Sequence, residues 1–190
     1  MENSQNFSKI PIETNSDMWE INDEGNEPIL QLINNKVIDH VGGKVTLFKE
    51  LEHNYKMQVE MRFLGHHLAE GNGGWFGLAI RAKDTENYEL VWFMPNAEEE
   101  NTVAYVSVAH GVVPWWTEAY RSQQKGKTAI PKDEWFQVQV EVIDDEFTVY
   151  VEGAEVLNKK LTYYLTDGYP GLYVGTATDA AFRRIEIERL

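Results

Sequence analysis

Residues 73–95, with the sequence GGWFGLAIRAKDTENYELVWFMP, decide the fold class of this chain. Apolar positions recur with period two on both sides of a polar turn, which is typical of two β-strands. Phe76, Leu78 and Ile80 share one face of the first strand, and the opposite face carries Trp75 and Arg81 beside small residues. Because aromatic residues occur on both faces, the second face either packs under another layer of chain or forms the floor of a binding groove.

The same alternation recurs along the whole chain, and helical periodicity is scarce. In residues 55–64 and 135–143, apolar side chains occupy every second position and polar side chains lie between them. Strands are therefore expected at residues 18–22, 28–33, 44–48, 55–64, 75–81, 88–93, 103–109, 135–143, 147–152, 171–176 and 182–189. About twelve short strands without recurring helices predict an all-β fold, an antiparallel two-sheet β-sandwich.

The composition indicates one domain and excludes several kinds of partner. A chain of 190 residues with 43% hydrophobic residues can bury one sizeable core, and we expect a polar tail at residues 1–16 and a single domain at 17–190. The absence of cysteine excludes disulfides and thiolate metal sites. A net charge of −14 argues against nucleic acid or an anionic membrane as partner and favours a neutral or cationic one.

The sequence carries no recognisable targeting signal. The N-terminal residues lack the apolar segment of a signal peptide, and no later segment approaches the ~20 apolar residues that span a bilayer. We expect a cytoplasmic protein from the sequence as written, or an exported one if the sequence is the mature form of a longer chain. The oligomeric state is not indicated.

A series of short motifs follows in a fixed order along the chain. These motifs are KVTLF at 44–48, EMR at 60–62, FGLAIR at 76–81, NYE at 87–89, EWF at 134–136, VYVEG at 149–153, GLYVG at 171–175 and AFRRIEI at 181–187. In this order, over residues 17–190, they resemble the concanavalin A-like lectin and glucanase superfamily, in particular its laminin-G-like bacterial branch with 3-keto-disaccharide hydrolase-type domains. The resemblance implies a jelly roll of two packed sheets, one of them curved into a shallow concave surface where sugar-binding members hold their ligand.

The resemblance also implies a structural ion. Family members often hold calcium at an edge between the sheets, and calcium prefers oxygen ligands. The candidate ligands in this chain are Asp17, Asp39 and Asp179, none of which has EF-hand spacing. A zinc site at His66 and His67 is not expected, because neighbouring side chains diverge in an extended segment.

Several catalytic signatures are absent. Glucanases of this superfamily carry Glu-x-Asp-x-x-Glu on one strand, whereas residues 58–62, QVEMR, offer one carboxylate. The Arg-rich and Gln-x-His strands of alginate-lyase-like members are also missing, as are serine-nucleophile, phosphate-binding and dinucleotide-binding motifs. These absences weaken the esterase, kinase and dehydrogenase interpretations, but the fold itself hosts lectins, hydrolases, lyases and interaction modules.

Three charged residues form the first candidate site. Glu60 and Arg62 lie on the polar face of one expected strand, and Arg81 lies on another. If the three meet on one sheet surface, an arginine–carboxylate pair orients sugar hydroxyls or a carboxylate. The alternative is a cross-strand ion pair without a ligand. Tyr88 and Trp92 beside Arg81 favour a sugar site, although aromatic residues in strands usually belong to the core.

Residues 109–121, AHGVVPWWTEAYR, form the second candidate site. Strand alternation cannot bury both Trp115 and Trp116, so one of them is expected to face a groove or rim. His110 and Glu118 are candidates for general acid–base catalysis. In the alternative, both tryptophans cover edges of the sandwich and His110 only hydrogen-bonds the loop.

These observations lead to one main hypothesis and two alternatives. In the main hypothesis the protein binds a saccharide in a concave groove walled by Tyr88, Trp92, Tyr105, Trp115 and Trp116, with Glu60, Arg62, Arg81 and His110 as polar contacts. In the first alternative it is a glycoside hydrolase or lyase of the 3-keto-glycoside type, with Glu60, His110 and Glu118 as catalytic residues. In the second it is a laminin-G-like protein-interaction module that binds no sugar.

Overall fold

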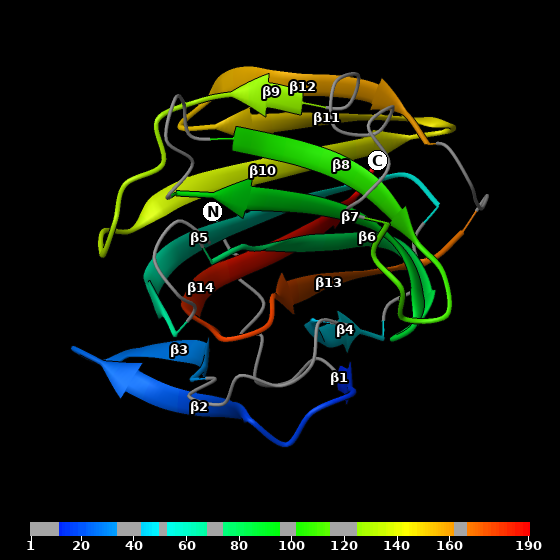
Figure 1. The fold of residues 1–190 in the computed structure, drawn as a ribbon. Helices are drawn as coiled ribbons and strands as arrows, with labels where there is room; N and C mark the ends of the chain where they lie inside the picture. The colour runs from blue at the N-terminus through cyan, green and yellow to red at the C-terminus, as the bar shows by residue number, and fades with distance from the viewer. Residues whose placement is uncertain are drawn as a thin grey trace.

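Two antiparallel sheets of seven strands pack face to face (Figure 1). The computed structural model describes residues 12–33, 43–49, 53–67, 74–95, 102–114, 125–161 and 167–190. Sheet A contains, in spatial order, β1 (Ile12–Thr14), β4 (Lys44–Phe48), β13 (Tyr169–Val174), β6 (Phe76–Asp84), β7 (Asn87–Met94), β8 (Thr102–Val108) and β9 (Lys125–Lys127). Sheet B contains β12 (Ala154–Lys160), β11 (Glu146–Val151), β10 (Phe136–Ile143), β5 (Tyr55–His66), β14 (Thr178–Arg189), β3 (Glu27–Leu32) and β2 (Trp19–Glu24).

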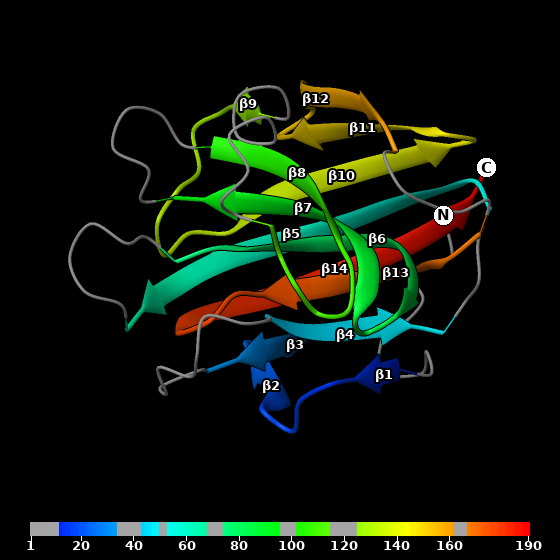
Figure 2. The ribbon, with the colours of Figure 1, turned by 45° about the vertical axis from the view of Figure 1, so that its right-hand side comes forward.

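The expected all-β sandwich is confirmed, because the described ranges contain strands and turns but no helix. Within those ranges there is accordingly no helix long and apolar enough to cross a membrane. Figure 2 shows β7 and β8 of sheet A in front of β5 and β10 of sheet B.

The apolar side of each strand fills the space between the sheets. From residue 55 to residue 63 of β5, the odd-numbered side chains are buried and the even-numbered ones are half-buried, as the alternation predicts. Phe76 of sheet A lies at the centre of this core, with four rings 5.8–6.3 Å from its own: Phe63, Phe93, Phe136 and Phe182. Such aromatic pairs each stabilise a protein by about 0.5–1.5 kcal/mol beyond the burial of their area, so this cluster joins the two sheets firmly.

The outer faces of the two sheets differ in character. The outer face of sheet A carries a second buried cluster that includes Leu47, Leu90 and, from the segment after β8, Val113. Trp75 and Trp92 are half-buried against this cluster. On sheet B, the outward positions of β5 and β10 are half-exposed, and most of them are polar. The outer face of sheet A is therefore a packed apolar layer, and that of sheet B is a polar surface.

Two-residue turns set the register of two hairpins. Gly25 and Asn26 join β2 to β3 with φ of 60° and 77°, and Glu152 and Gly153 join β11 to β12 with φ of 49° and 77°. Positive φ at both central residues is the geometry of a type I′ turn, which matches the twist of the flanking strands. Both turns thus lie between the strand ranges expected from the sequence or at their edge.

Three short strands lie outside the expected set, namely β1, β9 and β12. The strand β1 falls within residues 1–16, which the sequence pattern predicts as a polar tail. It pairs with β4, and Thr14 Oγ1 donates a hydrogen bond of 2.9 Å to the carbonyl oxygen of Val45. These strands border the sheets and lack a clear apolar alternation, so the period-two signal does not find them.

Candidate functional site

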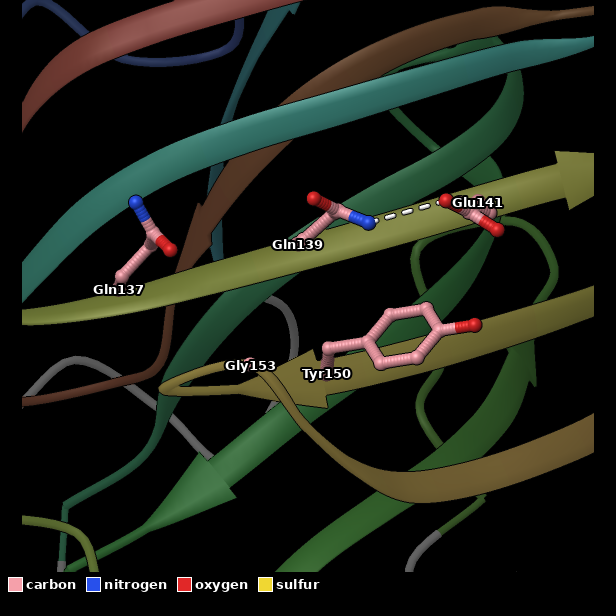
Figure 3. A pocket seen from close by; sticks show the side chains of 5 residues that line it. All are labelled: Gln137, Gln139, Glu141, Tyr150 and Gly153. Atoms are coloured by element: carbon pink, nitrogen blue, oxygen red, sulfur yellow. Dashed lines mark hydrogen bonds between the residues drawn. The ribbon is translucent and has the colours of Figure 1, made fainter.

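A shallow hollow of about 340 Å³ lies on the outer face of sheet B, over β10 and β11 (Figure 3). Its lining residues are Gln137, Gln139, Glu141, Tyr150 and Gly153. Figure 3 shows the two glutamine side chains and Glu141 in a row along β10, with the ring of Tyr150 lying beside them on β11. The hollow thus presents one aromatic ring and three polar side chains to solvent.

Strand alternation explains why these side chains share one surface. The residues between them on β10 point into the core and are at most 2% exposed: Phe136, Val138, Val140 and Val142. Tyr150 lies directly opposite Gln139 in the β10–β11 ladder, so the two side chains point to the same side. Gly153 has no side chain, so one end of the hollow is bounded by backbone alone (Figure 3).

The hollow combines hydrogen-bond donors and acceptors with an apolar ring face. Gln139 Nε2 donates a hydrogen bond of 3.0 Å to Glu141 Oε1, drawn as a dashed line in Figure 3. Burial, followed by the nearby carboxylates of Glu141 and Glu155, raises the pKa of Tyr150, so its hydroxyl keeps its proton at neutral pH and can donate. A ring flanked by amides and a carboxylate suits a ligand with one apolar face and many hydroxyl groups.

An ion-pair network adjoins the hollow on the same face. In the register of sheet B, Gln137 lies opposite Glu60, and Glu60 lies opposite Arg183. Glu60 Oε2 accepts a hydrogen bond of 2.6 Å from Arg183 Nε, and Glu60 Oε1 accepts one of 2.6 Å from Arg184 Nη1. Both carboxylate oxygens of Glu60 are therefore engaged by arginines in charge-assisted hydrogen bonds.

The β2–β3 hairpin contributes two more carboxylates to this network. Arg62 Nη1 and Nη2 each donate a hydrogen bond of 3.0 Å to the carboxylate of Glu24. Arg184 Nη2 donates one of 2.6 Å to Glu27, and Arg183 Nη1 lies 3.2 Å from the same carboxylate. The hydrogen bond from Arg184, with the charges of both arginines, holds the pKa of Glu27 below its usual range.

Trp135, at the start of β10, lies against two of these arginines. The guanidinium carbon of Arg62 is 4.5 Å from the indole centroid, and that of Arg183 is 4.3 Å from it. Arg184 has a φ of 49° at a β-bulge, which explains how two consecutive residues of one strand reach the same carboxylates. The cluster of Arg62, Arg183, Arg184 and Trp135 is called the arginine–tryptophan cluster below.

The three charged residues of the first sequence-predicted site do not meet. Glu60 and Arg62 lie on the outer face of sheet B, as expected, but Arg81 is 0% exposed and belongs to sheet A. A bulge between Ile80 and Asp84, with Arg81 at a φ of 50°, breaks the alternation at this residue. Its side chain reaches the turn of sheet B instead of the surface, so the expected surface site of the three residues is wrong.

The aromatic residues of the predicted groove divide between two faces. Tyr88 and Trp92 do share the outer face of sheet A, where Tyr88 is 2% exposed and Trp92 is half-buried. Tyr105 lies opposite Val91 and packs in the core between the sheets, with its ring 4.7 Å from that of Phe147. Tyr105 therefore cannot wall a groove on the outer face, which corrects the prediction.

The second sequence-predicted site lies largely outside the described residues, since Trp115, Trp116 and Glu118 all fall there. His110 is described as an exposed turn residue with a φ of 52°, and its backbone N–H donates a hydrogen bond of 3.1 Å to Asn87 Oδ1. The catalytic roles of His110 and Glu118 stay predictions.

The predicted calcium site also stays a prediction. Asp39 lies outside the described residues, and Asp17 and Asp179 lie within them. In the described part of the chain, no group of three or more histidine or acidic side chains is placed to hold a metal ion. Asp179 Oδ2 is 2.9 Å from His67 Nε2, so this carboxylate has a histidine neighbour.

Sequence reasoning missed the residues of the hollow and two of the arginines. The alternation of residues 135–143 marks Gln137, Gln139 and Glu141 as one polar face, but it does not mark that face as a site. Tyr150 and the consecutive Arg183 and Arg184 come close to this face only through the pairing of β10 with β11 and of β5 with β14. The local pattern contains no signal for such pairing.

Comparison with known proteins gives a family and a fold. A family described as the 3-keto-alpha-glucoside-1,2-lyase-like domain matches residues 13–188. Among solved structures, the carbohydrate binding module CBM66 from Bacillus subtilis is similar over 95% of this chain and 97% of its own, with a TM-score of 0.67 and 17% identity. A Bacillus subtilis protein of unknown function with a galectin-like fold is similar over 96% and 90%, with a TM-score of 0.62 and 13% identity.

A third structure shares the fold at a similar level. The carbohydrate recognition domain of Emp47p is similar over 94% of this chain and 88% of its own, with a TM-score of 0.58 and 11% identity. No curated protein matches the chain. At these identities the structural likeness establishes a galectin-like jelly-roll fold, and it does not by itself assign a ligand.

Proposed function

This chain belongs to the family of 3-keto-alpha-glucoside-1,2-lyase-like domains, and we propose that it binds a carbohydrate in the hollow over β10 and β11. The observation that carries the proposal is the position of the Tyr150 ring beside Gln139 and Glu141 in one open hollow (Figure 3). A sugar ring stacks its apolar face on a phenol ring, while amide and carboxylate groups bind its hydroxyls.

The size and surroundings of the hollow support a small polar ligand. Its volume of about 340 Å³ lies at the lower end of the range of ligand sites, roughly 300–1,000 Å³. The rest of the outer face of β5 and β10 is half-exposed, so a longer saccharide has room to extend along it. The family description names a glucoside, and two of the similar structures are a carbohydrate binding module and a carbohydrate recognition domain.

Cleavage of a glycosidic bond is the second candidate function, favoured by the description of the family as lyase-like. The hollow itself offers one carboxylate, Glu141, whereas hydrolysis by the usual route needs two carboxyl groups about 5–9.5 Å apart. Glu60 is close by in the sheet, but arginines engage both of its oxygens. We therefore place binding before catalysis, with Glu60, His110 and Glu118 as the catalytic candidates if turnover occurs.

Saturation-transfer NMR with a panel of neutral oligosaccharides, including 3-keto glycosides, tests both functions at once. Transfer to a sugar without new anomeric signals over hours indicates binding, and new anomeric signals indicate cleavage. The Tyr150→Ala variant is expected to weaken binding at least about tenfold, because it removes the stacking surface. Trp92→Ala, on the outer face of sheet A, is the matched control and is expected to leave affinity unchanged.

The opposite effects of the two variants would place the binding site on the other sheet. If Trp92→Ala abolishes transfer and Tyr150→Ala does not, the ligand binds on the outer face of sheet A, beside Tyr88 and Trp92 of the predicted groove. If no member of the panel receives transfer from the folded protein, carbohydrate binding is contradicted for that panel, and the protein-interaction module becomes the stronger hypothesis.

A further inference from the structure

The arginine–tryptophan cluster carries positive charge, which the proposed binding of a neutral sugar does not require. Three of the six arginines of the chain gather here, in a protein whose net charge is −14. Two of the guanidinium groups lie over one indole ring, which helps to hold them in place, and their hydrogen-bonding edges point to oxygen atoms, here those of Glu24, Glu27 and Glu60. Such a fork matches the geometry of a carboxylate.

The backbone of β14 is strained at Arg184, the residue that brings the third guanidinium into this cluster. Arg184 adopts a φ of 49°, a conformation that residues with a Cβ rarely adopt, and it does so at the bulge between Arg183 and Glu186. Without the bulge, Arg183 and Arg184 would point to opposite faces of β14. Strain of this kind persists where the surrounding structure or a function requires it, and here it brings a third guanidinium to the outer face.

The carboxylates that now occupy the cluster come from the β2–β3 hairpin, whose turn extends beyond the three residue pairs that join β3 to β14. Glu24 and Glu27 lie directly opposite each other across the β2–β3 turn, a position where two like charges repel. Their side chains are 43% and 39% exposed, whereas those of Arg62 and Arg183 are 18% exposed. In the described ladder β3 pairs with β14 through Leu30, Gln31 and Leu32, so the turn lies beyond this pairing. The glutamates therefore cover Arg62 and Arg183 from the solvent side, whereas the Arg184 side chain is itself 54% exposed.

We propose that the arginine–tryptophan cluster is a subsite for an acidic sugar, a hexuronate, whose carboxylate binds Arg62 in the place that Glu24 occupies in the free protein. The inference rests on the proposed sugar site, because the two are continuous: Gln137 of the hollow lies opposite Glu60, and Glu60 binds Arg183 of the cluster. An oligosaccharide in the hollow can therefore extend toward Arg62. Release of Glu24 and Glu27 leaves three arginines facing one carboxylate, that of Glu60, so the local charge favours an anion.

The overall negative charge does not prevent this binding. At physiological ionic strength, charges more than about 8 Å away are largely screened, whereas a guanidinium in contact with a carboxylate is not. The Glu24 carboxylate is 43% exposed and reaches Arg62 from the solvent side, so a ligand carboxylate with the same two-pronged geometry, which also stacks its ring, can replace it. Glu24 then acts as a competitor that the chain itself supplies.

Isothermal titration calorimetry with an oligogalacturonate and with its methyl ester tests the proposal at one fixed ionic strength. The two probes share every ring and hydroxyl and differ only at the carboxyl group, which is an anion in the acid and a neutral methyl ester in the other. Wild-type protein is expected to bind the acid more tightly than the ester. Glu24→Gln removes the competitor and is expected to raise affinity for the acid about three- to tenfold, without changing affinity for the ester.

Two further variants complete the test. Glu20→Gln removes the same charge from an exposed position of β2, so it corrects for the change in net charge. Arg62→Lys keeps the charge but loses the fork, and it is expected to weaken binding of the acid while the ester binds as before. Far-UV circular dichroism and the melting temperature of each variant establish that it is folded.

The proposal is overturned if the acid and the ester bind equally, if neither binds, or if Glu24→Gln has the same effect as Glu20→Gln. Its failure is distinct from failure of the sugar site itself. If binding of neutral oligosaccharides still depends on Tyr150, the proposed function stands and only the acidic subsite is contradicted. If binding of the acid depends on Arg62 but not on Tyr150, the acidic subsite is supported and sugar binding in the hollow is contradicted.

Discussion

The Arg81 guanidinium, which belongs to sheet A, donates a hydrogen bond of 3.0 Å from Nη2 to the carbonyl oxygen of Asp144 in the β10–β11 turn of sheet B. The backbone N–H of Arg81 donates another, of 3.3 Å, to the hydroxyl of Tyr55 on β5. Burial lowers the pKa of Arg81, and the charges of Asp167 and Asp144 oppose that effect. Arg81 thus fastens the two sheets together at one end of the sandwich, and its part in the fold is structural.

Replacement of Arg81 by methionine is expected to destabilise the protein without changing saccharide affinity. Methionine fills much of the volume but leaves the Asp144 carbonyl without its donor, and the loss should lower the free energy of unfolding by roughly 2–4 kcal/mol. Urea denaturation measures the change. Lys83→Met, which removes the same charge from an exposed position of the same strand, should alter stability by less than about 0.5 kcal/mol. Equal midpoints for the two variants would contradict the structural role.

Tyr105→Phe is expected to destabilise the protein, because Tyr105 donates a hydrogen bond to a side chain that is buried between the sheets. Glu89 is 0% exposed, and its Oε2 accepts hydrogen bonds from Tyr105 Oη at 2.9 Å and from Ser107 Oγ at 2.5 Å. Loss of one hydrogen-bond partner of a buried polar group should lower the free energy of unfolding by about 1–3 kcal/mol. Differential scanning calorimetry checks this, with Tyr150→Phe, at a half-buried position on the outer face of sheet B, as the control. An unchanged melting temperature for Tyr105→Phe would show that the contact is unimportant.

The β2–β3 turn is expected to loosen in acid before the core unfolds. The pKa of Glu27 is lowered in the folded protein, chiefly by the hydrogen bond from Arg184, and Arg183 also faces this carboxylate. A lowered folded pKa means that the stabilisation is complete above the unfolded value, about 4.3, and is lost as the pH falls through the folded value. Glu60 binds the same two arginines as Glu27, namely Arg183 and Arg184.

Amide hydrogen exchange, followed by NMR between about pH 7 and pH 3, measures this loosening after correction for the intrinsic exchange rate. Protection of the β2–β3 turn should fall with pH in the wild type, while β5 and β10 keep theirs. In Glu27→Gln the protection of the turn should be lower at neutral pH and less dependent on pH. If the amides of the wild-type turn are as protected at low pH as at neutral pH, the ion pairs do not stabilise the turn.

The strands were predictable where one face is buried, because burial of one face imposes a period of two. Residues 55–64 and 135–143 show this alternation in the sequence, and they form β5 and β10 with the expected sides in the core. Arg81 and Arg184 were not predictable in the same way, because each lies at a bulge that shifts the alternation by one residue. A bulge depends on the partner strand, so the local pattern does not report it.

The candidate site was only partly predictable for the same reason. The polar face of residues 135–143 was visible, and Glu60 and Arg62 were expected on a polar surface, where they lie. Tyr105 was expected in the groove but lies in the core; both faces of residues 103–106 are apolar, so nothing local distinguishes the core side from the outer side. Its opposite neighbour Val91 determines the side, and that pairing is a tertiary property.

The most direct test of the central claim is a chemical-shift titration of the isotope-labelled protein with an oligosaccharide that gives saturation transfer. The side-chain amide signals of Gln137 and Gln139 report on the hollow, and the indole signals of Trp75 and Trp92 report on the outer face of sheet A. Sugar binding in the hollow predicts saturable shifts of the two glutamine amides and of the Tyr150 backbone, with the two indole signals unmoved. Shifts of the indoles with unmoved glutamine amides would contradict the account and place the ligand on sheet A.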